Sequence, residues 1–240
     1  MAEKVGFSNP IKLEWLNDVA VYASRNLSRE EAGVELNNTI SQFITSPDNI
    51  RKIRVMLLNI WYSTTPSMLS EAKAVYNCVS SDEKIGIHYA LMADYYQVFF
   101  DVADVFGHLL VYRDEVSATQ VKAKIFEKWG QRSTLDTSLS KILKTFRDIT
   151  AVSSPKRQSE YVCVKHKIND IHVLGLLLQA LLKNSNQNYI GWDEFLSNPF
   201  MFPFEVCDLD ESHIAALPFI ELSRIDGRTV MSIKGYESTI

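Results

Sequence analysis

Basic and hydroxyl side chains gather in one segment of the chain, residues 117–167. This segment holds 11 Lys or Arg residues but only 4 Asp or Glu residues, a net charge of +7. The rest of the chain carries a net charge of −11, so the overall charge of −4 conceals a basic region. Ammonium groups and hydroxyls donate hydrogen bonds to phosphate oxygens, and phosphate contacts supply most non-specific affinity for nucleic acid. A basic segment in an acidic chain is typical of local nucleic-acid contact and excludes a protein that is basic over its whole surface.

The segment around residues 133–149 has the spacing of an amphipathic helix. Its apolar residues recur at intervals of four and three, which predicts a stripe facing a core: Leu135, Leu139, Ile142, Phe146 and Ile149. We expect the opposite face to enter a DNA groove, with six donors on it: Thr134, Thr137, Ser138, Lys141, Lys144 and Thr145. Asn and Gln, which read base edges, are absent from this helix, and Arg147 is its only arginine. The sequence therefore favours weak sequence specificity.

A second helix precedes this one after a short turn. Ser117 and Gln120 have the spacing of a capping box, which starts a helix that Gly130 ends. Ser133 then has the position of a cap for the next helix. Two helices joined by so short a glycine-containing turn indicate a helix-turn-helix. Its first helix would place three lysines beside the DNA backbone: Lys122, Lys124 and Lys128.

The residues that follow complete a recognisable plan. A short strand at 151–152, a basic loop at 153–159 and a strand at 161–165 predict a β-hairpin. A helix-turn-helix followed by a basic hairpin predicts a winged helix, here over residues 95–167. Lys156 and Arg157 would contact DNA from the loop of the hairpin.

The flanking regions predict a mainly α protein. Residues 1–94 read as a unit of successive helices, with prolines and capping boxes at the expected starts. Residues 85–112 are apolar almost all round and rich in aromatics, which indicates a buried helix with a break near Asp94. Residues 168–240 predict a small α+β region that packs on the core and contains a hairpin at Asp226 and Gly227.

Other residues could carry chemistry, and each has a plainer interpretation. Cys163 and His166, with Cys207 and His213, lack the regular spacing of a zinc site, so we expect no metal. His88 and His108 could act in acid–base catalysis, but no nucleophile motif or phosphate loop accompanies them. The aromatic run 95–100 could stack on bases, although core packing is favoured. We therefore expect neither catalysis nor a cofactor.

Composition places the chain among globular proteins, with 46% apolar and 22% charged residues. Three scattered cysteines give no disulfide framework and fit a reducing cytoplasm. The N-terminus lacks the pattern of a signal peptide, and the most apolar stretch, 171–182, is too short to span a membrane. We expect a cytoplasmic protein without membrane contact.

A helical N-terminal unit followed by a helix-turn-helix from Ser117 to Ile149 resembles the BrxA proteins of BREX phage-defence systems. The resemblance covers the arrangement of elements over residues 11–165. It implies a non-enzymatic, DNA-binding accessory factor in defence against phage. The alternative is a protein-assembly module, in which the winged helix docks a partner encoded in the same operon.

Overall fold

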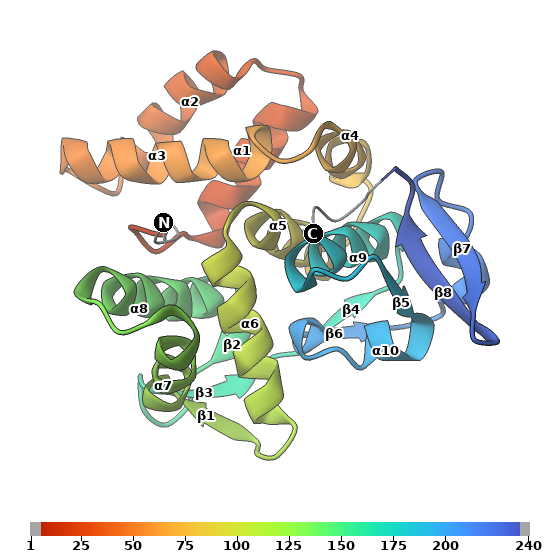
Figure 1. The fold of residues 1–240 in the computed structure, drawn as a ribbon. Helices are drawn as coiled ribbons and strands as arrows, with labels where there is room; N and C mark the ends of the chain where they lie inside the picture. The colour runs from red at the N-terminus through yellow and green to blue at the C-terminus, as the bar shows by residue number, and fades with distance from the viewer. Residues whose placement is uncertain (1–5, 236–240) are drawn as a thin grey trace.

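The structure, a computed structural model, describes residues 6–235 and is mainly helical. In Figure 1 the helices surround a central helix, α5, and small sheets lie below and to the right of it. Among residues 6–235, no helix has both the length and the apolar character needed to cross a membrane.

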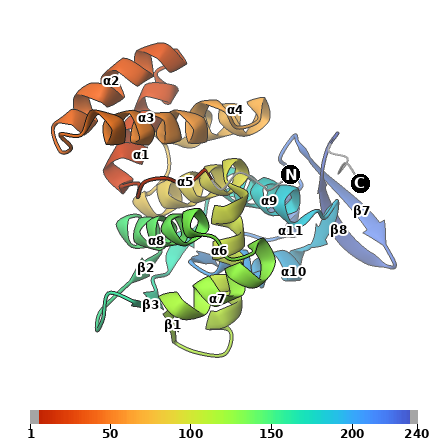
Figure 2. The same cartoon turned by 60° about the vertical axis from the view of Figure 1, so that its left-hand side comes forward.

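Four helices form the N-terminal region: α1 (Leu13–Ser24), α2 (Arg29–Ser41), α3 (Pro47–Tyr62) and α4 (Pro66–Val75). Figure 2 shows them together as one layer above α5. Their starts follow the local sequence: Ser28 and Glu31 form the expected capping box of α2, and prolines occupy the first turns of α3 and α4. The helical N-terminal region is thus confirmed.

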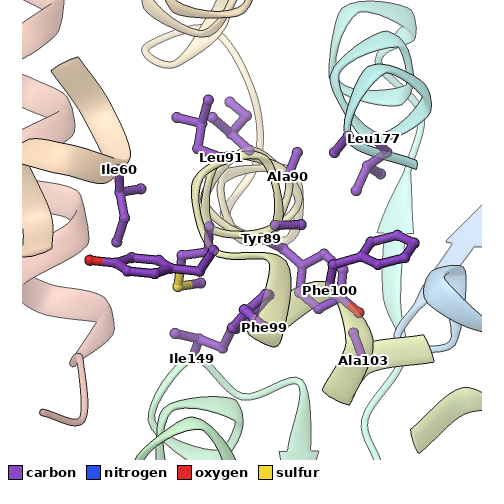
Figure 3. Packing of buried hydrophobic residues seen from close by; sticks show 14 of the residues in the cluster. Ile60, Tyr89, Ala90, Leu91, Phe99, Phe100, Ala103, Ile149 and Leu177 are labelled. Carbon is purple, nitrogen blue, oxygen red and sulfur yellow. The ribbon is translucent and has the colours of Figure 1, made fainter. Parts of the chain in front are cut away.

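Helices α5 (Ser81–Tyr95) and α6 (Gln97–Leu110) meet at a sharp break. Tyr96 interrupts the helix with an extended conformation, φ −115° and ψ 97°, which confirms the break expected near Asp94. Figure 3 shows side chains radiating from α5 toward Ile60 of α3 on one side and Leu177 on the other. A helix packed on several sides needs apolar residues around most of its circumference, which accounts for the unusual composition of this segment.

The basic segment folds as β1 (Glu115–Ser117), α7 (Ala118–Trp129), α8 (Ser133–Asp148), β2 (Val152–Ser153) and β3 (Glu160–Cys163). The three strands form an antiparallel sheet in the order β1-β3-β2. The capping box of Ser117 and Gln120 starts α7, and Gly130 follows it with φ +74°. The expected cap at Ser133 is wrong: Arg132 occupies the cap position without a side-chain hydrogen bond, and Ser133 is already helical.

The C-terminal region mixes short strands and helices. Its elements are β4 (His166–Ile168), α9 (Ile171–Ser185), β5 (Tyr189–Gly191), α10 (Trp192–Leu196), a 3-10 turn (Pro199–Met201), β6 (Phe204–Val206), α11 (Glu211–Ile214), β7 (Ile220–Ile225) and β8 (Arg228–Ile233). Strand β4 pairs in parallel with β6, and β5, β8 and β7 form an antiparallel sheet. Asp226 and Gly227, both at positive φ, form the expected hairpin turn.

One connected cluster of buried apolar residues runs through the N-terminal, basic and C-terminal regions. Helix α9 packs along α5, and the 3-10 turn packs on α6. The hydroxyl of Tyr89 on α5 donates to the carbonyl of Phe200 at 2.9 Å, so a buried polar group also joins these regions. The basic segment is therefore held on a shared core.

Candidate nucleic-acid interface

Helix α8 presents a polar stripe to solvent beside its apolar core face. Thr134, Thr137 and Lys144 are exposed and Lys141 is half-buried, at the spacing of successive turns. Within residues 6–235, neither Lys141 nor Lys144 has a carboxylate within ion-pair distance. These two ammonium groups can thus donate to a phosphate without first losing a carboxylate partner.

Two residues expected on this stripe do not lie there. Ser138 and Thr145 are both buried. The backbone N–H of Ile11 donates to Oγ1 of Thr145 at 2.9 Å, so the segment before α1 covers that flank of the helix. The prediction that these two hydroxyls reach a DNA groove is wrong, because a second packing surface occupies their side of α8.

The lysines of α7 differ in their surroundings. Nζ of Lys122 lies 2.8 Å from a carboxylate oxygen of Asp136 and 3.0 Å from Oγ of Ser140, which ties α7 to α8. Lys124 pairs with Glu127 at 3.0 Å on the exposed face of α7. Exposed pairs contribute roughly 0–1 kcal/mol, so a phosphate can compete for Lys124. Lys122 is half-buried and also positions α8.

Lys128 forms an ion pair with a buried carboxylate. Its Nζ lies 2.8 Å from Oδ1 of Asp101 on α6, whose side chain is only 1% exposed. Trp129 Nε1 donates to the other oxygen at 2.6 Å, and the Gln97 amide donates to Oδ1 at 3.1 Å. An ionised buried carboxylate requires such donors. Lys128 therefore holds α7 on α6. Its side chain remains exposed, so its contact with the DNA backbone stays a prediction, in which a phosphate would compete with Asp101.

The loop between β2 and β3 carries Lys156 and Arg157, both exposed. Lys156 pairs with Glu115 of β1, and this hydrogen bond raises the pKa of the lysine above its ordinary value. Arg157 lies 3.7 Å from Glu160. Each cation thus has an acidic neighbour, on β1 or at the start of β3, which reduces the net positive charge of the loop.

Arg147 connects the hairpin to α8, a role that the sequence did not reveal. Its Nη1 donates to the carbonyl of Gln158 at 3.4 Å, and its guanidinium lies 6.0 Å from the ring centre of Tyr161. Only helical spacing together with the hairpin register could have found this contact. The arginine places the basic loop at the C-terminal end of the exposed stripe of α8.

The histidines and cysteines serve no shared site. His88 is buried, with Nδ1 accepting from Trp61 Nε1 at 3.3 Å and Nε2 lying 3.0 Å from Oδ1 of Asn17. His108 lies exposed on another helix, 3.7 Å from Asp104. Cys163 is half-buried with its Sγ directed at the carbonyl of Phe202. Across residues 6–235 no cluster of His, Cys, Asp or Glu could hold a metal ion.

No known protein family, curated protein or solved structure matches this chain.

Proposed function

We propose that residues 97–163 form a winged helix that binds duplex DNA with weak sequence specificity and without catalysis. Helix α6 would be its first helix, α7 and α8 the helix-turn-helix, and β2 and β3 the wing. The order α6, β1, α7, α8, β2, β3 and the strand order β1-β3-β2 support this assignment. Helix α8 would lie in the major groove, with the wing beside it.

The observation that carries the proposal is the free cationic stripe on α8. Lys141 and Lys144 lie on the helix surface without carboxylate partners among the described residues. Arg147 then joins this stripe to the loop that holds Lys156 and Arg157. The lysines of the helix have no carboxylate partner, and the cations of the loop have only exposed partners. Such cations can bind the phosphates of a DNA backbone. The short hydroxyls of Thr134 and Thr137 add donors without base-specific geometry.

A salt titration of duplex binding tests this proposal. Engagement of about four phosphates predicts a log–log slope of affinity against salt of about −4. Reversing both charges with Lys141→Glu/Lys144→Glu should reduce the slope by about two and weaken binding at least tenfold. Lys73→Glu/Arg228→Glu is the matched control, since it changes the net charge equally on α4 and β8. Equal losses in both variants would refute a localised interface.

The weak sequence specificity is tested with duplexes of unrelated sequence. Because α8 presents Thr, Ser and Lys rather than Asn, Gln or Arg at its exposed positions, affinities should agree within about tenfold. A preference of about a thousandfold for one sequence would contradict the proposal.

An accessory role in phage defence follows from the resemblance to BrxA and belongs to the same proposal. It requires that a host carrying the system lose protection when this chain is deleted. Complementation by the wild type, but not by Lys141→Glu/Lys144→Glu, would connect that role to DNA binding. Full complementation by the double variant would separate the two.

A second function, docking of a protein partner, is favoured by one observation. Val111 and Tyr112, in the turn after α6, are 66% and 85% exposed. A cavity of about 470 Å³ opens beside them, lined by residues of α6, β3 and the turn before β6. Large apolar side chains left in solvent next to a cavity are typical of an interaction site. A partner from the same operon that binds the wild type, but not Val111→Ser/Tyr112→Ser, would support this function.

A further inference from the structure

A second cavity lies beside the segment that precedes α1. Its volume is about 360 Å³, within the usual size range of small-ligand sites. Helix α3, the segment that precedes α1 and the junction of α5 with α6 line it. Six of the residues that line the cavity from these elements are Ser8, Arg51, Lys52, Val55, Asn59 and Tyr95.

Tyr95 gives this cavity an aromatic surface. In the aromatic run 95–100, Tyr96, Phe99 and Phe100 are buried, so core packing explains them. Tyr95 is 38% exposed, and its ring meets that of Tyr96 edge-on, with centroids 4.8 Å apart. The perpendicular contact restrains the Tyr95 ring, and more than a third of the side chain remains exposed beside the cavity. A fixed, half-exposed aromatic ring in a cavity is suited to stacking on a planar ligand.

Two cationic side chains line the same cavity. Arg51 and Lys52, in the second turn of α3, both pair with Asp48, so the three side chains together carry one net positive charge. These pairs are exposed, and exposed pairs contribute roughly 0–1 kcal/mol. A phosphate can therefore replace Asp48 as the partner of either cation, with Arg51 able to bind two of its oxygens at once.

Asn59 adds a polar group with a settled orientation. Its Oδ1 accepts a hydrogen bond from Nη2 of Arg29 at 2.6 Å. Because Oδ1 is occupied, the NH₂ group, which also interacts with Tyr96, is the part of this amide that can donate to a ligand. A side-chain amide of this kind can bond the edge of a base.

We propose that this cavity binds one unstacked nucleotide, with its base on the ring of Tyr95 and its phosphate on Arg51 and Lys52. An aromatic platform beside cations is the combination by which proteins hold single-stranded nucleic acid. The site uses α3 and the α5–α6 junction, whereas duplex binding is assigned to α8 and the wing. Because the two sites use different residues, either can be refuted without the other.

Fluorescence anisotropy with a labelled single strand of eight thymidines tests the site. Tyr95→Ala should weaken binding about tenfold, because loss of one stacked base has an effect of that size. Tyr95→Phe keeps the ring and should stay within twofold of the wild type. Tyr189→Ala is the matched control, since Tyr189 is 47% exposed on β5 and outside the cavity. Each variant's thermal unfolding midpoint checks that the fold is intact.

The same measurements are repeated in the Lys141→Glu/Lys144→Glu background, where binding through α8 is removed. The dependence on Tyr95 should persist there, and Arg51→Ala/Lys52→Ala should weaken binding and flatten its salt dependence.

Adenosine monophosphate, as a competitor, distinguishes a free nucleotide from a strand. Displacement of the strand assigns the cavity to the single nucleotide, and no displacement assigns it to the strand. If this background binds neither the oligonucleotide nor the mononucleotide, or Tyr95→Ala binds as the wild type does, the proposal is overturned. Duplex binding by the wild type would survive either result.

Discussion

The backbone N–H of Ile11 donates a hydrogen bond to Oγ1 of Thr145 at 2.9 Å, across 134 residues of sequence. Both residues are buried. The bond fixes the segment before α1 against one flank of α8, so the N-terminal region and the basic segment are held together.

Thr145→Val should destabilise the protein without weakening duplex binding. Valine has nearly the same shape, but it leaves the buried N–H of Ile11 without an acceptor. We expect the free energy of unfolding to fall by about 1–3 kcal/mol. Chemical denaturation measures this loss, and Thr137→Val, on the exposed stripe, should change stability by less than about 0.5 kcal/mol. Equal effects of the two variants would contradict the packing described for α8.

Lys128→Met should likewise reduce stability more than DNA affinity. The change removes a donor from the buried carboxylate of Asp101 and leaves Trp129 and Gln97 as its partners. A hydrogen bond to a charged group contributes about 1.5–3 kcal/mol, so we expect a loss of that order in urea unfolding. Lys124→Met, which breaks an exposed pair, should lose under about 1 kcal/mol. A greater loss of duplex affinity than of stability for Lys128→Met would show that this lysine contributes mainly to DNA binding.

His88 should make the protein less stable in acid. Burial lowers the pKa of His88 to about 3, whereas an unfolded chain binds the proton near pH 6.5. The neutral ring is thus favoured in the fold, and its contribution is complete above pH 6.5 and is lost as the pH falls toward 3. In that window one proton corresponds to a slope of about 1.4 kcal/mol per pH unit.

Replacement of His88 by Asn should remove that slope from the pH dependence of unfolding. Asn has groups that can donate and accept toward Trp61 and Asn17 but does not titrate. His108→Asn is the control, because His108 is exposed. An unchanged acid slope in His88→Asn would show that other groups control acid unfolding.

Gly107 should tolerate no side chain. A Cβ on this residue of α6 would lie 1.9 Å from the carbonyl oxygen of Pro199, a backbone atom. Relief of that clash requires α6 and the 3-10 turn to move apart, so Gly107→Ala should cost about 3 kcal/mol or more. Gly33→Ala, in α2, would meet Leu58 at an ordinary 3.4 Å and should raise stability by about 0.5 kcal/mol. Thermal unfolding distinguishes the two directions.

Most helices and turns of this fold could be predicted from short-range patterns. The capping boxes at Ser28 and Ser117 start helices where the sequence predicts them, and Asp226 with Gly227 turns the last hairpin. Such features depend on hydrogen bonds and backbone angles within a few residues, so the local sequence contains the information that specifies them.

The candidate interface was predicted less well. Helical spacing found the core stripe of α8 and placed Lys141 and Lys144 on the surface, but it treated Ser138 and Thr145 as surface residues. It could not show that Lys128 caps the buried Asp101. Ser138 and Thr145 are buried, and Lys128 is exposed but pairs with a carboxylate of another helix. These features depend on contacts with other segments, so they cannot be found when α7 or α8 is considered alone.

The sequence by itself determined a mainly helical chain, a basic segment of net charge +7 and its two helices followed by a hairpin, but not strand β1. The tertiary structure decided which cations are free, which carboxylates are buried and which aromatic ring of the 95–100 run reaches solvent. The physical reason is the separation along the chain over which each kind of interaction acts. Hydrogen bonds of caps and turns act over a few residues, whereas burial and ion pairing depend on contacts between segments far apart in the chain.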